Sequence, residues 1–220
     1  MGEPIDLVIF DCDGVLVDSE LLAAAVLARE VSAEGYPLTT EACLERFTGI
    51  SMRNVLALIE REWRPLPAGF EERVRAADFA AFAASLQPVA GVAEMLPRLP
   101  YRRCVASSGT PEKIRFTLGL TGLLPFFAPH LYSASMVASG KPAPDLFLHA
   151  AREMHADPAA CVVIEDAVAG ITAARAAGMR VLGFAGASHC RDGYGAMLQR
   201  AGAPVVFTRM AELPERLNYA

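Results

Sequence analysis

The sequence predicts an α/β fold in which a doubly wound parallel sheet carries a helical insertion after its first strand. Short runs such as Leu7–Phe10 are apolar at every position, which is typical of strands buried on both faces of a parallel sheet. From residue 88 onward such runs alternate with segments of helical periodicity, and this alternation indicates β-α units. Residues 16–86 contain little that has strand character, so they are expected to be the insertion.

The insertion is predicted to be helical because its apolar residues recur at helical spacing. We therefore expect two domains, an α/β core of residues 1–15 and 87–220 and a helical cap domain of residues 16–86. The expected cap helices are one through Leu21 and Val31 with Asp18 or Ser19 as N-cap, one from Ser51 to Trp63 that ends before Pro65 and Pro67, and one over residues 71–86.

The core elements are expected in a regular order after the insertion. Thr110 is a candidate N-cap with Pro111 at the first helical position, where a missing N–H is harmless, and Gly178 is a candidate helix end. The expected elements are helix 91–99, strand 103–106, a helix from residue 110, strand 130–133, helix 145–155, strand 162–164, helix 168–177, and strands 180–184 and 205–207.

Composition and charge exclude several classes of protein. The chain has 220 residues, of which 53% are hydrophobic and 20% charged, and this composition indicates a globular protein with a sizeable core. The net charge is −5 and no run of lysines or arginines occurs, so no nucleic-acid partner is expected. The longest apolar stretch, residues 21–28, is too short to span a bilayer, so no membrane partner is expected.

The N-terminal residues and the cysteines predict the compartment. Glu3 and Asp6 lie near the start and no basic segment precedes an apolar one, so no signal peptide is expected. Five cysteines, an odd number without a Cys-x-x-Cys pair, fit a reducing environment. We therefore expect a cytoplasmic protein, and nothing in the sequence requires more than a monomer.

Polar side chains directly follow three of the expected strands, and a lysine lies in a loop stiffened by two prolines. Because the carboxyl ends of parallel strands meet at one edge of a sheet, where open α/β sheets bind ligands, we expect the groups that follow the three strands to gather there. The lysine's loop precedes an expected helix. The groups are Asp11 and Asp13 after the first strand, Ser107 and Ser108 after strand 103–106, Glu165 and Asp166 after strand 162–164, and Lys141 beside Pro142 and Pro144.

The closeness of the carboxylates of Asp11 and Asp13 has to be explained. Like charges about 4 Å apart repel by roughly 4 kcal/mol at an effective dielectric of about 20. The pair therefore suggests a bound metal, a shared proton, or both. Alternatively it is a simple turn, since Asp and Gly are common after strands, and Glu165 and Asp166 could simply stabilise the start of the next helix.

These residues, in this order, resemble the four motifs of the haloacid dehalogenase superfamily. Residues 165–179 further resemble the subfamily of beta-phosphoglucomutase and small sugar-phosphate phosphatases. The resemblance covers nearly the whole chain and implies a Rossmann-like core with a cap that closes over the site. The matching segments are Asp11 to Glu20 for the first motif, Ser107 for the second, Lys141 in Gly140-Lys141-Pro142 for the third, and Glu165-Asp166 for the fourth.

The resemblance implies a role for each catalytic residue. Asp11 would be the nucleophile that forms an aspartyl-phosphate, which divides a difficult displacement into two easier steps. Asp13 would protonate the leaving alcohol and then activate water; the dehalogenases of the superfamily lack this Asp, since a halide needs no proton. Lys141 would hold the phosphate oxygens together with Asp11. Ser107 would hydrogen-bond the phosphate, and its neighbour Ser108 is a rival for that role.

The resemblance also implies a Mg²⁺ ion held by Asp11, Asp13 and Asp166. Glu165 would be a secondary ligand, and Asp13 could contact the metal through its backbone alone. Mg²⁺ prefers oxygen ligands and retains several waters. Asp11, Glu165 and Asp166 together carry a charge of −3, and Mg²⁺ and Lys141 together carry +3. The site is therefore neutral if Asp13 is protonated.

Departures from the mutase pattern decide the expected reaction. Beta-phosphoglucomutases carry a cap histidine that promotes attack by a sugar hydroxyl, and the corresponding residue here is Ala23. Their basic substrate-binding positions are Thr48 and Met52 here, although Arg53 is adjacent and remains a candidate substrate-binding residue. Without those groups, water is the better acceptor. His189 follows a strand end and could approach the site.

We therefore expect a Mg²⁺-dependent phosphatase that hydrolyses small phosphorylated metabolites, such as sugar or sugar-acid phosphates, through an aspartyl-phosphate. One alternative is a sugar phosphate mutase of the beta-phosphoglucomutase type. Another is a non-catalytic module that binds a metabolite or a partner, although such a module has no need for both Asp11 and Asp13.

Overall fold

A parallel sheet of six strands lies at the centre of residues 4–218, the part of the chain that the computed structural model describes. The strands lie in the order β3-β2-β1-β4-β5-β6, so the chain moves first to one side of β1 and later to the other. This arrangement confirms the predicted doubly wound α/β fold. The strands are β1 (Leu7–Phe10), β2 (Arg102–Ser107), β3 (Leu131–Ser133), β4 (Cys161–Glu165), β5 (Arg180–Phe184) and β6 (Val205–Phe207).

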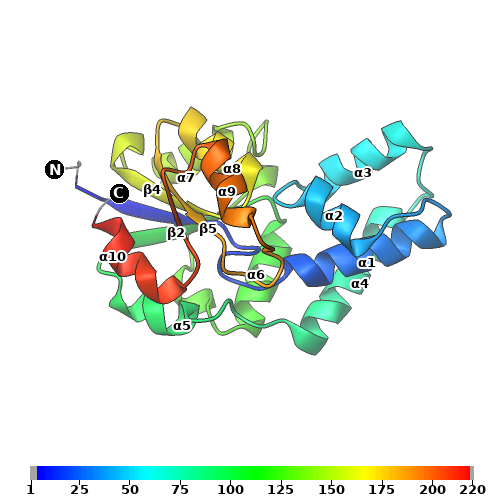
Figure 1. The fold of residues 1–220 in the computed structure, drawn as a ribbon, viewed down its shortest axis with the longest axis horizontal. Coiled ribbons are helices and arrows are strands. Elements are labelled where there is room, and N and C mark those ends of the chain that lie inside the picture. The colour runs from blue at the N-terminus through cyan, green and yellow to red at the C-terminus, as the bar shows by residue number, and fades with distance from the viewer. Residues whose placement is uncertain (1–3, 219–220) are drawn as a thin grey trace.

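Helices cover both faces of the sheet (Figure 1). They are α5 (Val92–Met95), α6 (Pro111–Leu120), α7 (Asp145–Glu153), α8 (Val168–Ala176), α9 (Tyr194–Ala201) and α10 (Leu213–Leu217). Short 3₁₀ turns are η1 (Leu96–Arg98), η2 (Leu124–Phe126), η3 (Ala134–Met136), η4 (Pro158–Ala160) and η5 (Met210–Glu212). Across the described residues, no helix has both the length and the apolar character needed to cross a membrane.

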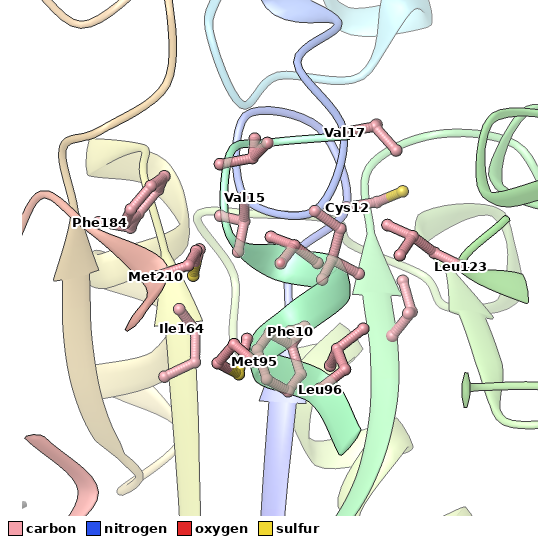
Figure 2. Close-up of a cluster of buried hydrophobic side chains, with 14 of the residues drawn as sticks. Phe10, Cys12, Val15, Val17, Met95, Leu96, Leu123, Ile164, Phe184 and Met210 are labelled. Atoms are coloured by element: carbon pink, nitrogen blue, oxygen red, sulfur yellow. The ribbon is translucent and has the colours of Figure 1, made fainter. Parts of the chain in front are cut away.

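The alternation of side chains along β1 divides the core into two layers. Phe10 belongs to the hydrophobic cluster that contains residues of α5, α6 and α10. Figure 2 shows Phe10 in this cluster with Met95 and Leu96. Ile9 belongs to the opposite cluster, which contains residues of α7, α8 and α9. Cys12, which lies between Asp11 and Asp13, is buried in the first cluster.

The four cap helices follow β1 and precede β2, and they extend away from the sheet (Figure 1). They have a hydrophobic cluster of their own, in which Val31, Ile59 and Val74 are fully buried. Leu16 and Leu86, at the proposed domain boundaries, pack instead with the cluster on the sheet. The helices are α1 (Glu20–Ala33), α2 (Thr40–Phe47), α3 (Met52–Glu62) and α4 (Phe70–Ser85).

Local signals in the sequence predicted some elements better than others. Thr110 caps α6 by accepting a hydrogen bond from the Lys113 amide, with Pro111 as the first helical residue, as predicted. Ser19 does precede α1, but its hydroxyl donates to Asp13 instead of capping the helix. The sequence pattern did not indicate α2, α9 or α10, and the helix expected over residues 91–99 is a short α-helix followed by a 3₁₀ turn.

Candidate active site

The ends of three neighbouring strands bring acidic and hydroxyl side chains together. Asp11 follows β1, Ser107 ends β2, and Glu165 ends β4 with Asp166 directly after it. Because β1 lies between β2 and β4, these residues share one edge of the sheet, beside the point where the strand order reverses. The Asp11 amide donates to the Ile164 carbonyl at 3.0 Å, which anchors the start of the Asp11 loop to β4.

Lys141 connects these side chains from the loop before α7. Its Nζ donates to Asp11 Oδ1 at 2.7 Å, to Glu165 Oε1 at 2.6 Å and to the Ala106 carbonyl at 3.0 Å. Burial by itself would lower the pKa of the Lys141 ammonium, but Asp11 and Glu165 outweigh burial and raise it. Lys141 is therefore held as a buried cation in direct contact with Asp11.

Glu165 is fully buried beneath the first turn of α8. Its Oε1 accepts from Lys141, and its Oε2 accepts from the Ala167 amide at 2.9 Å. Gly170 of α8 makes room for this carboxylate, because a Cβ at that position would lie 1.8 Å from Glu165 Oε1. Glu165 thus has a fixed orientation that in turn positions Lys141.

The replacement Gly170→Ala is expected to destabilise the protein by about 1–3 kcal/mol, because overpacking forces Glu165 or α8 to move. Urea unfolding would measure this change. The matched control is Gly119→Ala in α6, where no atom lies within 4 Å of the new Cβ. That control should be neutral or stabilising by up to about 1 kcal/mol, since alanine favours a helix more than glycine does. Equal effects of the two replacements would contradict the packing described for Glu165.

Asp166 is buried at the same edge and keeps one oxygen without a hydrogen bond. His189 Nε2 lies 3.1 Å from Asp166 Oδ2 but not in hydrogen-bond geometry, and it pairs with Tyr194 Oη at 3.1 Å. His189 therefore approaches the site, as the sequence suggested.

Gly14 lies against the carboxylate of Asp166. Its φ of +73° lies in the left-handed region, and a Cβ there would lie 2.0 Å from Asp166 Oδ2.

Asp11, Glu165 and Asp166 form a group that fits a divalent cation. Each offers a carboxylate oxygen, and these oxygens all lie within 4.8 Å of one another. Together they carry three negative charges, and Lys141 contributes one positive charge, which leaves an excess of two. Burial, with repulsion from Glu165 added, raises the pKa of Asp11 to about 7 and raises the pKa of Asp166 well above its usual value. A divalent cation would supply the charge that these carboxylates lack.

Asp13 has charged and polar partners that sequence reasoning missed. Ser19 Oγ donates to Asp13 Oδ1 at 2.5 Å, and Lys113 Nζ of α6 lies 2.9 Å from the same oxygen. Burial pushes the pKa of Asp13 up, but Lys113 and Ser19 more than offset burial and lower it. A neutral site therefore does not require a protonated Asp13, because the charge of an ionised Asp13 is offset by Lys113.

A cavity of about 590 Å³ lies between this edge of the sheet and the cap. Arg53, at the start of α3, is exposed and lines the cavity from the cap side. From the core, the cavity is lined by Asp11, Asp13, Ser107, Ser108, Lys113 and Lys141. The structure therefore brings the predicted substrate-binding residues to one open cavity between the core and the cap.

The two serines after β2 have different surroundings. Ser107 is buried, and its hydroxyl accepts a hydrogen bond from the Gly109 amide at 3.0 Å. Ser108 donates to the carbonyl of Gly49 in the cap at 3.0 Å. Because Ser108 already connects core and cap, we favour Ser107 over Ser108 as the residue that binds phosphate.

Sequence reasoning did not single out several charged residues that line the cavity, among them Asp78 and Lys113, and it named Glu20 only as the end of the first motif. A signal existed for Lys113, because it lies in the first turn of a helix that begins at the edge of the site. Asp78 interrupts a buried apolar stripe of α4. Glu20 is an acidic residue at the start of a helix, which is common, so no local pattern shows that it lines a cavity. In the structure, burial raises the pKa of Glu20 to about 8.

Comparisons with known proteins extend over almost the whole chain. A family model described as haloacid dehalogenase-like hydrolase matches residues 5–178. The 6-phosphogluconate phosphatase of Escherichia coli (strain K12) is 30% identical over 213 residues, which cover 96% of this chain and 94% of that protein. A conserved haloacid dehalogenase-like protein of Agrobacterium tumefaciens (str. C58) has a solved structure with a TM-score of 0.84 and 42% identity, covering 98% of both chains.

A further similar structure is that of a HAD family hydrolase from Deinococcus radiodurans R1, solved with bound phosphate and sodium. It has a TM-score of 0.77 and 33% identity, and the match covers 98% of this chain and 96% of that chain. The similarity thus includes the parallel sheet, the cap inserted after β1 and the strand ends that carry the acidic group. The chain therefore belongs to the haloacid dehalogenase-like hydrolases, in the beta-phosphoglucomutase-like and sugar-phosphate phosphatase subfamily with a helical cap, and it is an enzyme of the phosphatase class.

Proposed function

We propose that this enzyme hydrolyses phosphate esters of small metabolites, sugar or sugar-acid phosphates, with Mg²⁺ and through an aspartyl-phosphate. One observation carries the proposal: the carboxylate of Asp11 lies at the end of β1, bonded to Lys141 and beside the unused oxygen of Asp166. A nucleophile, a phosphate-binding cation and a metal ligand therefore meet at one edge of the sheet.

Asp11 is the proposed nucleophile. One of its oxygens attacks phosphorus, the bond from phosphorus to the ester oxygen breaks, and the leaving alkoxide takes a proton. Water then attacks the aspartyl-phosphate, which releases inorganic phosphate and restores the carboxylate. Lys141, 2.7 Å from Asp11 Oδ1, offsets negative charge as phosphate approaches, and the Ser107 hydroxyl lines the same cavity as a donor.

Asp13 is the proposed acid and base. Lys113 and Ser19 hold it as a carboxylate, the form that accepts a proton from the attacking water. The acid step needs the protonated form, and a bound phosphate ester favours it, because an added negative charge nearby raises the pKa of a carboxyl group.

Mg²⁺ is the proposed cofactor, and the donor set supports it. The oxygens of Asp11 and Asp166 suit a hard cation, Glu165 completes the acidic group, and the backbone of Asp13 is the further contact that the family resemblance implies. When bound, the ion would neutralise charge on the phosphate oxygens. The Deinococcus radiodurans relative, solved with phosphate and sodium, shows that a similar fold can hold an anion and a cation.

The proposed substrate class rests on the cavity and on relatives. A cavity of about 590 Å³ suits a small metabolite, and its cap walls limit access for phosphoproteins and nucleic acids. Arg53 provides an exposed positive charge for a second anionic group, as on a sugar acid. The relative that is 30% identical over nearly the full chain is a 6-phosphogluconate phosphatase.

A mutase reaction is the second candidate, and the cavity disfavours it. Ala23 and Thr48 line the cavity at the positions where the mutase pattern carries histidine and a basic residue. Neither side chain can activate a sugar hydroxyl, so we favour water as the acceptor. A purely binding module would leave the paired acids Asp11 and Asp13 without a chemical purpose.

The decisive test is phosphate release from a panel of sugar phosphates, sugar-acid phosphates and p-nitrophenyl phosphate, with Mg²⁺ or with excess EDTA. We expect release with Mg²⁺ and loss of at least about 100-fold with EDTA, since the metal stabilises transition-state charge. Product analysis with beta-glucose 1-phosphate is the control for the mutase reaction. Glucose 6-phosphate as the main product, or no turnover of any ester by folded protein, would contradict the proposal.

A further inference from the structure

Asp78 is a buried carboxylate on cap helix α4 that the proposed mechanism does not use. It is 7% exposed and lines the cavity. Within residues 4–218 its side chain makes no hydrogen bond or ion pair, and its Oδ1 is buried without a partner. Buried polar atoms are nearly always hydrogen-bonded, so an unpartnered carboxylate facing a cavity indicates a partner that arrives from outside the protein.

The position of Asp78 in its helix shows that packing alone does not explain it. The buried residues of α4 are Phe70, Val74, Asp78 and Phe82, which are spaced by four residues and lie on one face. Three of the four are apolar, as expected for a helix face that only packs. At the third position an apolar side chain would stabilise the helix more than a carboxylate that loses its hydration.

The part of α4 that carries Asp78 is attached to the core. Phe79 stacks on Phe116 of α6 with 4.5 Å between ring centroids, and Lys113 Nζ of α6 lies 5.5 Å from the Phe82 ring centroid. Burial raises the pKa of Asp78 to about 7, Lys113 opposes this rise and Asp13 adds to it. Asp78 is thus held on the side of the cavity where Lys113 and Asp13 lie, which is the side of the proposed leaving group.

We propose that Asp78 is a specificity-determining residue whose carboxylate accepts a hydrogen bond from a hydroxyl group of the substrate's leaving alcohol. The inference rests on the proposed function, because the alcohol is the part of a phosphate ester that Asp13 would protonate. Nearby cations do not remove the need for such a partner: Lys113 pairs with Asp13 at 2.9 Å, and Arg29 pairs with Glu30 at 2.8 Å.

A hydrogen bond to Asp78 would distinguish substrates that carry hydroxyl groups from substrates that do not. A hydroxyl group can donate to Asp78 and satisfy it, whereas an ester without hydroxyl groups leaves the carboxylate buried and unpaired when the substrate excludes water. A carboxylate of the substrate at the same place would be repelled. A sugar acid would therefore have to direct its acid group away from Asp78, and a neutral polyol end is preferred beside it.

The test compares Asp78→Ala and Asp78→Asn with wild type on two substrates, the best sugar phosphate of the panel and p-nitrophenyl phosphate, which has no hydroxyl group. Asp78→Ala should lower kcat/KM for the sugar phosphate by about 10- to 100-fold, as expected for a hydrogen bond to a charged group. For p-nitrophenyl phosphate the value should change by less than about twofold. Asp78→Asn keeps an acceptor oxygen and should retain part of the selectivity.

Thermal unfolding separates this role from a structural one. Removal of an unpartnered buried carboxylate should leave Tm unchanged or raise it, while selectivity falls. The control Glu72→Gln removes the same charge from an exposed position of α4 that does not line the cavity, and should leave both properties unchanged.

The possible failures can be told apart. Equal loss on both substrates together with a lower Tm would show a structural role for Asp78 and overturn the inference. Unchanged selectivity in Asp78→Ala, with an active wild type, would overturn the inference alone and leave the proposed function standing. A wild type that releases no phosphate from any ester would overturn the proposed function and the inference with it.

Discussion

The replacement Asp11→Asn is expected to lower phosphate release by at least about 10⁴-fold, because removal of a covalent nucleophile eliminates the first chemical step. The amide has the shape of the carboxylate but cannot form an acyl phosphate. Asp11 is 5% exposed and shares Lys141 with Glu165, so one negative partner of Lys141 remains in the variant. We therefore expect the fold to persist.

Phosphate release on the best substrate, beside circular dichroism and Tm, would check this prediction. The matched control is Asp192→Asn, which makes the same change at an exposed position and should keep wild-type turnover. Retained turnover in Asp11→Asn would remove Asp11 as the nucleophile. Loss of turnover together with loss of the helical signal would instead indicate unfolding of the variant.

The replacement Lys141→Met is expected to have the second large effect, on both stability and activity. Lys141 is 3% exposed and bonds both Asp11 and Glu165. Its removal leaves two buried carboxylates without their cation, which we expect to cost about 3–5 kcal/mol of unfolding free energy. Turnover should also be lost, because the phosphate would meet uncompensated negative charge.

Urea unfolding in Mg²⁺-free buffer measures the stability effect, since bound metal would mask it. The control Arg209→Met breaks an exposed pair, in which Arg209 Nε lies 2.8 Å from Glu212 Oε1 and the arginine side chain is 79% exposed. We expect that control to change stability little, because exposed ion pairs contribute little to it. The double variant Lys141→Met, Glu165→Gln should recover part of the lost stability, because it removes one unpaired charge. A cost for Lys141→Met no larger than for Arg209→Met would contradict the buried network.

The sequence by itself determined the sheet and the residues at its edge. The runs that became β1, β2 and β4 have apolar centres, and polar residues directly follow each centre; the centres are Leu7–Phe10, residues 104–106 and residues 161–164. Parallel strands place their carboxyl ends at one edge whatever the loops between them do, so the proximity of Asp11, Ser107 and Asp166 follows from strand prediction alone. Lys141 could be assigned to the same site only through the resemblance of its motif.

Only the tertiary structure decided the partners of these residues. Asp13 meets Lys113, which is 100 residues away in the chain, so no local pattern shows that its pKa is lowered. The sequence also shows no reason for Gly170, whose missing Cβ gives Glu165 its space. Asp78 appears in the sequence as one more charged residue of a helix, and only the packing of α4 in the folded protein buries it beside the cavity. The order of apolar and polar residues along the chain determines where strands end. Charge pairing and burial depend instead on contacts between distant segments, and those contacts exist only in the folded protein.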